Sequence, residues 1–188
     1  MNPIPVIIDC DPGVDDAIAF LLARQLPELN VLAITSVAGN VEVERTTYNA
    51  LGLLEFLDWD IPVYRGASGP IFRERVDAAN VHGPDGMAGF DLPHTRREVQ
   101  GVNAWDAIHQ YAVEWRGALE IVAIGPLTNL AMAFVKYPDL PGLLHRIVFM
   151  GGSTAEGNVT PAAEFNIFAD PEAADIVLRA GVPVHMCG

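Results

Sequence analysis

The chain has 188 residues, of which 51% are hydrophobic, and its 24 acidic and 11 basic residues give a net charge of -13. A chain of this length and apolar content can bury most of its apolar surface in one domain. Its negative field would repel nucleic acid, anionic membranes and phosphorylated small molecules. We therefore expect no nucleic-acid or membrane partner, and a neutral small molecule as the ligand.

Cysteine usage and hydropathy bear on the compartment. Cys10 and Cys187 are the only cysteines, and their spacing fits neither a disulfide framework nor a cysteine-based metal site. The sequence enters an apolar strand directly, without the pattern of a secretion signal, and no apolar run is long enough to span a bilayer. The expected localisation is the cytoplasm.

Short apolar runs alternate with helical patterns along the whole chain, which is typical of a parallel sheet wound with helices. We expect one α/β domain over residues 1–188, with a Rossmann-like open, mostly parallel sheet and helices on both faces. The expected strands are 6–8, 31–37, 63–65, 119–124, 146–150 and 183–186. The expected helices are 15–25, 43–57, 103–115, 127–137 and 171–180. The long segment 66–102 should carry short elements of its own or a function.

Four carboxylates crowd the first strand-to-helix connection, V-I-I-D-C-D-P-G-V-D-D-A-I-A-F at residues 6–20. Asp9 and Asp11 alternate along an extended run and share one side, whereas Asp15 and Asp16 fall in the first helical turn. Two carboxylates about 4 Å apart repel by roughly 4 kcal/mol near a protein surface, and a helix N-terminus returns only about 0.3 to 1 kcal/mol each. The stretch therefore predicts a bound cation rather than four capping acids.

The nearby candidate ligands are all oxygens, which favours a hard cation over zinc. We expect Ca²⁺, because it accepts mixed carboxylate, carbonyl and hydroxyl ligands more readily than Mg²⁺ does. An EF-hand starting at Asp9 does not fit, since Val14 stands where that loop needs glycine.

Other polar or glycine-rich features follow several of the expected strands. Because ligands of open parallel sheets bind outside the carboxyl ends of the strands, these features should gather at one rim. They are Asn40, His82, Gly125, the G-G-S after Met150, and the polar run after Gly157.

The motif D-C-D-P-G-V-D-D-A-I-A resembles the N-terminal signature of the inosine-uridine-preferring nucleoside hydrolases. These calcium-dependent enzymes cleave the N-glycosidic bond of ribonucleosides. The resemblance implies Ca²⁺ held by Asp11, Asp16 and the main-chain carbonyl of Ile124. It also implies Asp11 as the general base, with Asp9 supporting the ligand network.

The segments at 157–174 and 80–86 extend the resemblance. The candidate substrate-binding residues are Asp15, Asn40, His82, Met150, Asn158, Glu164 and Asn166. Asn and Glu side chains supply the donors and acceptors that sugar hydroxyls need. Phe165 could pack against the sugar or fill the core, and the core is the favoured alternative. Asp170 is expected to start a helix.

Two alternatives remain. The D-x-D pattern also resembles haloacid-dehalogenase-type phosphatases, although Gly13 stands where that family has Thr or Val, and Lys136 is the only lysine. The other alternative is a calcium- or ribose-binding fragment without turnover. Family members are longer, and the resemblance implies a His-Asp pair beyond the matched region, so the sequence is either a fragment or incomplete for catalysis. The resemblance also suggests a homo-oligomer, a dimer or a tetramer.

Overall fold

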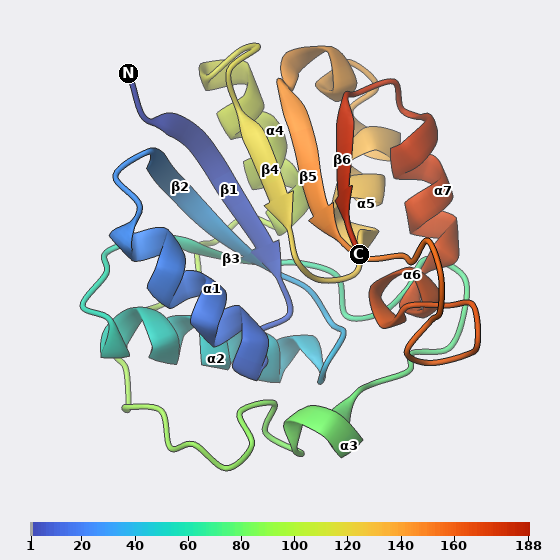
Figure 1. Cartoon of the computed structure of the whole chain (residues 1–188). Coiled ribbons are helices and arrows are strands. Elements are labelled where there is room, and N and C mark those ends of the chain that lie inside the picture. Colours follow the sequence, from blue (N-terminus) through green and yellow to red (C-terminus); the bar gives the residue numbers. More distant parts are fainter. Residues whose placement is uncertain (1) are drawn as a thin grey trace.

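The computed structural model describes residues 2–188, which form a six-stranded sheet in the order β3-β2-β1-β4-β5-β6 (Figure 1). Every adjacent pair of strands is parallel. The strands are β1 (Ile4–Cys10), β2 (Leu29–Ser36), β3 (Val63–Arg65), β4 (Glu120–Ala123), β5 (Arg146–Met150) and β6 (Val184–Cys187). The strand order reverses between β1 and β4, which is where ligands of such sheets bind. The expected fold class is confirmed.

The five helices expected from periodicity are present, each within one residue of its expected ends. They are α1 (Val14–Gln25), α2 (Val43–Phe56), α4 (Ala104–Glu114), α5 (Thr128–Lys136) and α7 (Pro171–Arg179). Three further elements were not located by periodicity: α3 (Ala79–His82), α6 (Phe165–Ala169) and the 3-10 helix η1 (Leu140–Leu143). Each is only four or five residues long, too short to show a helical period.

Two apolar clusters pack against the two faces of the sheet. One joins alternate β1 residues, such as Ile8, to α1 and α2. The other joins Ile7, on the opposite side of β1, to α4, α5 and α7, which lie behind the sheet in Figure 1. Ile108 and Ala112 of α4 are fully buried in this second cluster. The apolar stripe of α4 is therefore core.

Helix α1 turns only part of its apolar surface toward the sheet. Its buried residues are Asp16, Phe20 and Ala23, which recur at helical spacing. Ile18 and Leu22 are instead 63% and 59% exposed. This helix is apolar on both sides, so periodicity alone does not identify its buried face. Within residues 2–188, no helix combines the length and the apolar character that crossing a bilayer requires.

The long segment between β3 and α4 is a strap that crosses to α7 and then returns to the carboxyl ends of the strands. Where the strap meets the start of α7, the backbone N–H of Ile71 donates to Asp170. The guanidinium of Arg73 donates two hydrogen bonds to the carboxylate of Glu172. On the way back, the N–H of Ala78 donates to the carbonyl of Asn40 at 3.0 Å. The strap then forms α3, so the prediction that it carries an element of its own is confirmed. Asp170 also starts α7, as expected, by accepting a hydrogen bond from the N–H of Ala173.

Candidate functional site

A cavity of about 590 Å³ opens at the carboxyl ends of the strands, between the strap, α3 and the segment that leads into α6. Its volume suits a small organic ligand. Every candidate site residue named from the sequence lines this cavity except Asp9 and Asp16, which are almost fully buried. The candidates that line it are Asp11, Asp15, Asn40, His82, Ile124, Met150, Asn158, Glu164 and Asn166.

The carboxylate of Asp11 is enclosed by two turns that contain glycine, at Gly39 and Gly125. The backbone N–H of Asn40 donates to its Oδ2 at 2.7 Å. A Cβ placed on Gly39 would collide with that same oxygen, and a Cβ on Gly125 would lie 2.6 Å from Oδ1. Glycine at both positions therefore lets the ends of β2 and β4 close around this one carboxylate.

Each of the other two buried carboxylates uses one oxygen and leaves the second without a partner. Asp16 Oδ2 accepts the N–H of Gly13 at 2.9 Å, so the Asp16 side chain helps to cap the N-terminus of α1. Asp9 Oδ1 accepts hydrogen bonds from Thr35 and Asn129. Asp9 Oδ2 and Asp16 Oδ1 are buried without any hydrogen-bond partner among the described residues. Unpaired buried carboxylate oxygens are costly, and coordination to a cation would offset that cost.

Burial disturbs the ionisation of all three carboxylates. It raises the pKa of Asp11 well above its ordinary value, and the nearby charge of Asp16 raises it further. Burial and the charge of Asp15 raise the pKa of Asp16 to about 8. Burial raises the pKa of Asp9 to about 6, although the hydrogen bonds from Asn129 and Thr35 oppose the shift. A divalent cation would stabilise the ionised forms and reverse these shifts.

The residues present fit a hard cation, provided that not all of its ligands are side chains. Across residues 2–188, no three His, Cys, Asp or Glu side chains come together as a complete metal site. Asp11 and Asp16 would therefore need main-chain, water or substrate oxygens beside them. The residues that line the cavity include no Lys or Arg in the described chain, so no permanently charged side chain there would bind a phosphate group.

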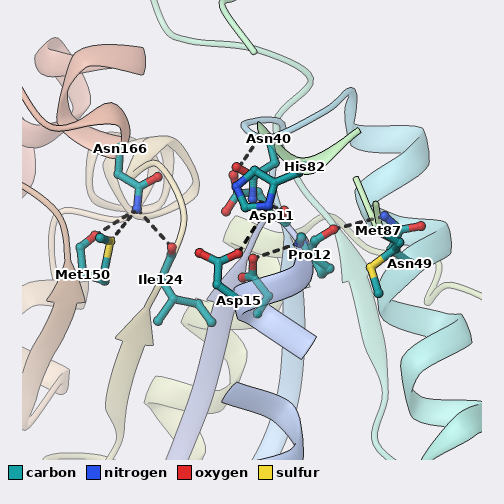
Figure 2. Close-up of polar contacts among 12 residues, drawn as sticks. Asp11, Pro12, Asp15, Asn40, Asn49, His82, Met87, Ile124, Met150 and Asn166 are labelled. Carbon is teal, nitrogen blue, oxygen red and sulfur yellow. Dashed lines mark hydrogen bonds and ion pairs between the residues drawn. The ribbon is translucent and has the colours of Figure 1, made fainter. Parts of the chain in front are cut away.

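The carbonyl of Ile124, the predicted main-chain ligand, is oriented by Asn166 (Figure 2). The side-chain amide of Asn166 donates to this carbonyl and to that of Met150, both at 3.0 Å. One side chain of α6 thus ties the ends of β4 and β5 together. A carbonyl has a second lone pair, so Ile124 can still face a cation. Both amide hydrogens of Asn166 are engaged, which leaves its Oδ1 for a ligand.

Glu164, predicted to bind a sugar hydroxyl, is also the N-cap of α6. Its carboxylate accepts the N–H groups of Asn166 and Gly152, both at 2.9 Å, and that of Ile167 at 3.3 Å. These bonds hold the turn after β5 against α6. Because a carboxylate has about four acceptor positions, Glu164 retains capacity for a ligand at the cavity wall.

His82 and Asn40 close over the turn between β1 and α1. His82 Nδ1 lies 3.7 Å from Asp15 Oδ1, and the amide of Asn40 donates to the carbonyl of Asp11 at 3.0 Å. Figure 2 draws His82 and Asn40 together above Asp11. A Cβ on Gly13 would lie 2.7 Å from Asn40 Nδ2 and 2.8 Å from His82 Nδ1. Glycine in the D-P-G turn therefore makes room for both side chains.

Sequence reasoning missed the apolar part of the cavity wall. Phe165 was expected in the core, but it belongs to neither apolar cluster and lines the cavity with Phe168. Val76 and Val81, from the strap and α3, also line it. The position of Phe165 directly after the N-cap Glu164 could have indicated a helix that starts at the site. No signal in the sequence placed the strap residues.

Comparisons with known proteins identify relatives of this chain. The family model described as inosine-uridine preferring nucleoside hydrolase matches residues 6–188. The non-specific ribonucleoside hydrolase RihC of Escherichia coli O127:H6 (strain E2348/69 / EPEC) is 48% identical over 185 residues, which are 98% of this chain and 61% of that protein. This chain therefore spans about 61% of the length of the curated relatives it matches.

Solved structures of nucleoside hydrolases also superpose on this chain. A plant nucleoside hydrolase, the PpNRh1 enzyme, superposes with a TM-score of 0.92 at 44% identity, covering 99% of this chain and 60% of that one. A purine-preferring ribonucleoside hydrolase from Gardnerella vaginalis superposes with a TM-score of 0.93 at 36% identity, covering 97% and 60%. The family model covers residues 6–188, and this range includes every residue that lines the cavity.

Proposed function

Because the chain belongs to the inosine-uridine preferring nucleoside hydrolase family, we propose that its cavity binds a ribonucleoside and hydrolyses the N-glycosidic bond. The products would be a free nucleobase and ribose. The observation that carries the proposal is the burial of three carboxylates, Asp9, Asp11 and Asp16, where β1 leads into α1, beside a cavity whose wall, in the described chain, has no Lys or Arg. A neutral nucleoside suits such a cavity, and the names of the relatives support the same class of reaction.

Ca²⁺ is the proposed cofactor, held by Asp11, Asp16 and the main-chain carbonyl of Ile124. All three supply oxygen ligands, and Ca²⁺ tolerates irregular mixtures of carboxylate, carbonyl and hydroxyl oxygens better than Mg²⁺ does. When bound, it would supply the positive charge that keeps the buried carboxylates ionised and makes a water molecule more acidic. The raised pKa values and the unpaired oxygens of the cluster support this assignment.

Asp11 is the proposed general base. Its Oδ2 is held by the N–H of Asn40, which leaves Oδ1 to take a proton from the attacking water. Hydrolysis of an N-ribosidic bond passes through a sugar with oxocarbenium character. Carboxylates fixed close to the ring stabilise that positive charge as it develops, without having to reorganise.

The remaining wall residues would orient the nucleoside. Asp15 and Asn158 line the cavity and offer oxygen and nitrogen atoms to the ribose hydroxyls. His82 lies on α3, where it would meet the base, while Phe165 and Phe168 offer apolar surface to the sugar or the base. Further proposed contacts are Asn40, Met150, Glu164 and Asn166.

The proposal is tested by incubating the chain with inosine and with uridine in Ca²⁺, and measuring free ribose with a reducing-sugar assay. We expect ribose from the wild type and almost none from Asp11→Ala, while circular dichroism shows that both proteins are folded. A nucleoside that binds by calorimetry without releasing ribose would instead support the binding fragment. Release of phosphate from a phosphomonoester would support the phosphatase alternative. The lack of Lys or Arg among the described residues that line the cavity argues against that alternative.

A further inference from the structure

Asn129 is a fully buried side chain that joins three strand ends. It is the second residue of α5, and its amide nitrogen donates to Asp9 Oδ1 at 2.8 Å and to the carbonyl of Ser36 at 3.0 Å. Its amide oxygen accepts the N–H of Ala67 at 2.8 Å. Asp9 lies in β1, Ser36 ends β2, and Ala67 follows β3. No single backbone element makes this connection.

The surroundings of Asn129 are built tightly around its amide. A Cβ placed on Gly66 would collide with both amide atoms of Asn129 and with the carbonyl of Ser36. The chain therefore approaches Asn129 through a residue that has no side chain. Two donor hydrogens and one acceptor are used at once, which only an amide provides at this length.

The segments tied by Asn129 are those that hold Asp11. From Asp9, two steps along the chain lead to Asp11 itself. From Ser36, β2 leads to Gly39 and Asn40, which confine Asp11 Oδ2 and donate to it. The turn that precedes α5 closes the other side of the same carboxylate, at Gly125. Asn129 does not line the cavity, so it is placed to act through these segments alone.

We propose that Asn129 is a positioning residue for the reaction: its amide fixes the ends of β1 and β2 so that Asp11 has the geometry needed to bind the cation. It touches neither the substrate nor the cation. This inference rests on the proposed function. It adds that the cation site depends on a side chain outside the ligand set and 118 positions along the chain from Asp11. Changes that disturb residues supporting metal ligands typically weaken metal binding by about 10-fold to 100-fold.

The test is Asn129→Asp, which keeps the size of the side chain and the acceptor for Ala67. It replaces the donor with an oxygen that faces Asp9 and the Ser36 carbonyl. We expect the dissociation constant for Ca²⁺, measured by calorimetry on the full chain, to rise by about 10-fold or more. Ca²⁺ alone is the probe, so the readout does not depend on turnover.

The matched control is Thr128→Val, in the preceding residue of the same helix. Thr128 is also buried, and its hydroxyl donates to Asp170 at 2.8 Å, outside the carboxylate cluster. This variant loses a buried hydrogen bond, so its melting temperature should fall while its affinity for Ca²⁺ stays at the wild-type value. If Asn129 had a purely structural role, Asn129→Asp would also lower the melting temperature and leave the affinity for Ca²⁺ unchanged.

A second variant, Gly66→Ala, displaces the Asn129 amide without changing its chemistry, and should also weaken Ca²⁺ binding. Its control is Gly101→Ala, where a Cβ meets no atom within 4 Å. If Gly66→Ala and Asn129→Asp both bind Ca²⁺ as the wild type does, the role of Asn129 is refuted and the proposed function stands. If the wild type itself binds no Ca²⁺, the proposed Ca²⁺ cofactor is refuted, and the proposed role of Asn129 is refuted as well.

Discussion

Asp16 should make the metal-free chain less stable as the pH rises. Its carboxylate is 3% exposed, one of its oxygens has no partner among the described residues, and its pKa is raised from 3.8 to about 8. Between these two values the folded chain holds a proton that the unfolded chain has released. The free energy of unfolding therefore falls with rising pH through this window. The variant Asp16→Asn removes the effect, because an amide stays neutral and still accepts the N–H of Gly13.

The size of the effect follows from linkage. One proton bound only by the folded state changes the free energy of unfolding by about 1.4 kcal/mol per pH unit. For a domain of this size that corresponds to a shift in melting temperature of roughly 3 to 5 °C per pH unit. The raised pKa of Asp11 adds to the slope, and the pKa of Asp9, raised to about 6, adds to it below that pH. In chelator, the wild type should therefore melt several degrees higher at pH 5 than at pH 7.

The assay is thermal unfolding followed by circular dichroism from pH 5 to 8, with chelator or with saturating Ca²⁺. In chelator, Asp16→Asn should show a shallower slope than the wild type and be at least as stable at pH 8. Ca²⁺ should raise the melting temperature of the wild type most at high pH and leave the variant nearly unchanged. Asp91→Asn, at an exposed carboxylate, serves as the control. Equal slopes for the wild type and Asp16→Asn would refute the account of Asp16.

Three further outcomes follow from the contacts around the cavity. Asn166→Ala should weaken Ca²⁺ binding in calorimetry, because the Ile124 carbonyl loses the amide that orients it; unchanged affinity would contradict that role. Glu164→Ala removes the N-cap of α6 and should cost about 1 kcal/mol, or roughly 2 to 4 °C in melting temperature, and no shift in a melting scan would argue against the cap. Gly125→Ala should abolish ribose release, because its Cβ would lie 2.6 Å from Asp11 Oδ1; normal turnover would show that the position of Asp11 does not depend on glycine at residue 125.

The sequence was sufficient for the sheet, the longer helices and the rim at which the site forms. Alternating apolar runs predict parallel strands, and the carboxyl ends of such strands meet at one edge, so Asp11 and Asn40 could be brought together without coordinates. Asn158 and Asn166 belong to the polar run after Gly157, which the same rule placed at this rim, and the resemblance added their substrate-binding role. They line the cavity with Asp11 because α6 and its leading segment fold back over the ends of β4 and β5.

The sequence was insufficient where one side chain has two roles or where a contact spans the chain. Glu164 was interpreted only as a ligand, although its carboxylate also caps α6. Asn129 was not among the candidate residues, because nothing local in the sequence indicates that its amide reaches β1 and β2. Phe165 was assigned to the core since an aromatic residue gives no sign of which side of a short helix it occupies.

The most direct test is a crystal structure of the chain grown with Ca²⁺ and ribose. We expect one Ca²⁺ ion with oxygen atoms of Asp11, Asp16 and the Ile124 carbonyl at about 2.3 to 2.6 Å. The ribose hydroxyls should complete its coordination. Clear density for ribose beside these carboxylates with no ion between them, or Ca²⁺ bound only elsewhere on the molecule, would contradict it.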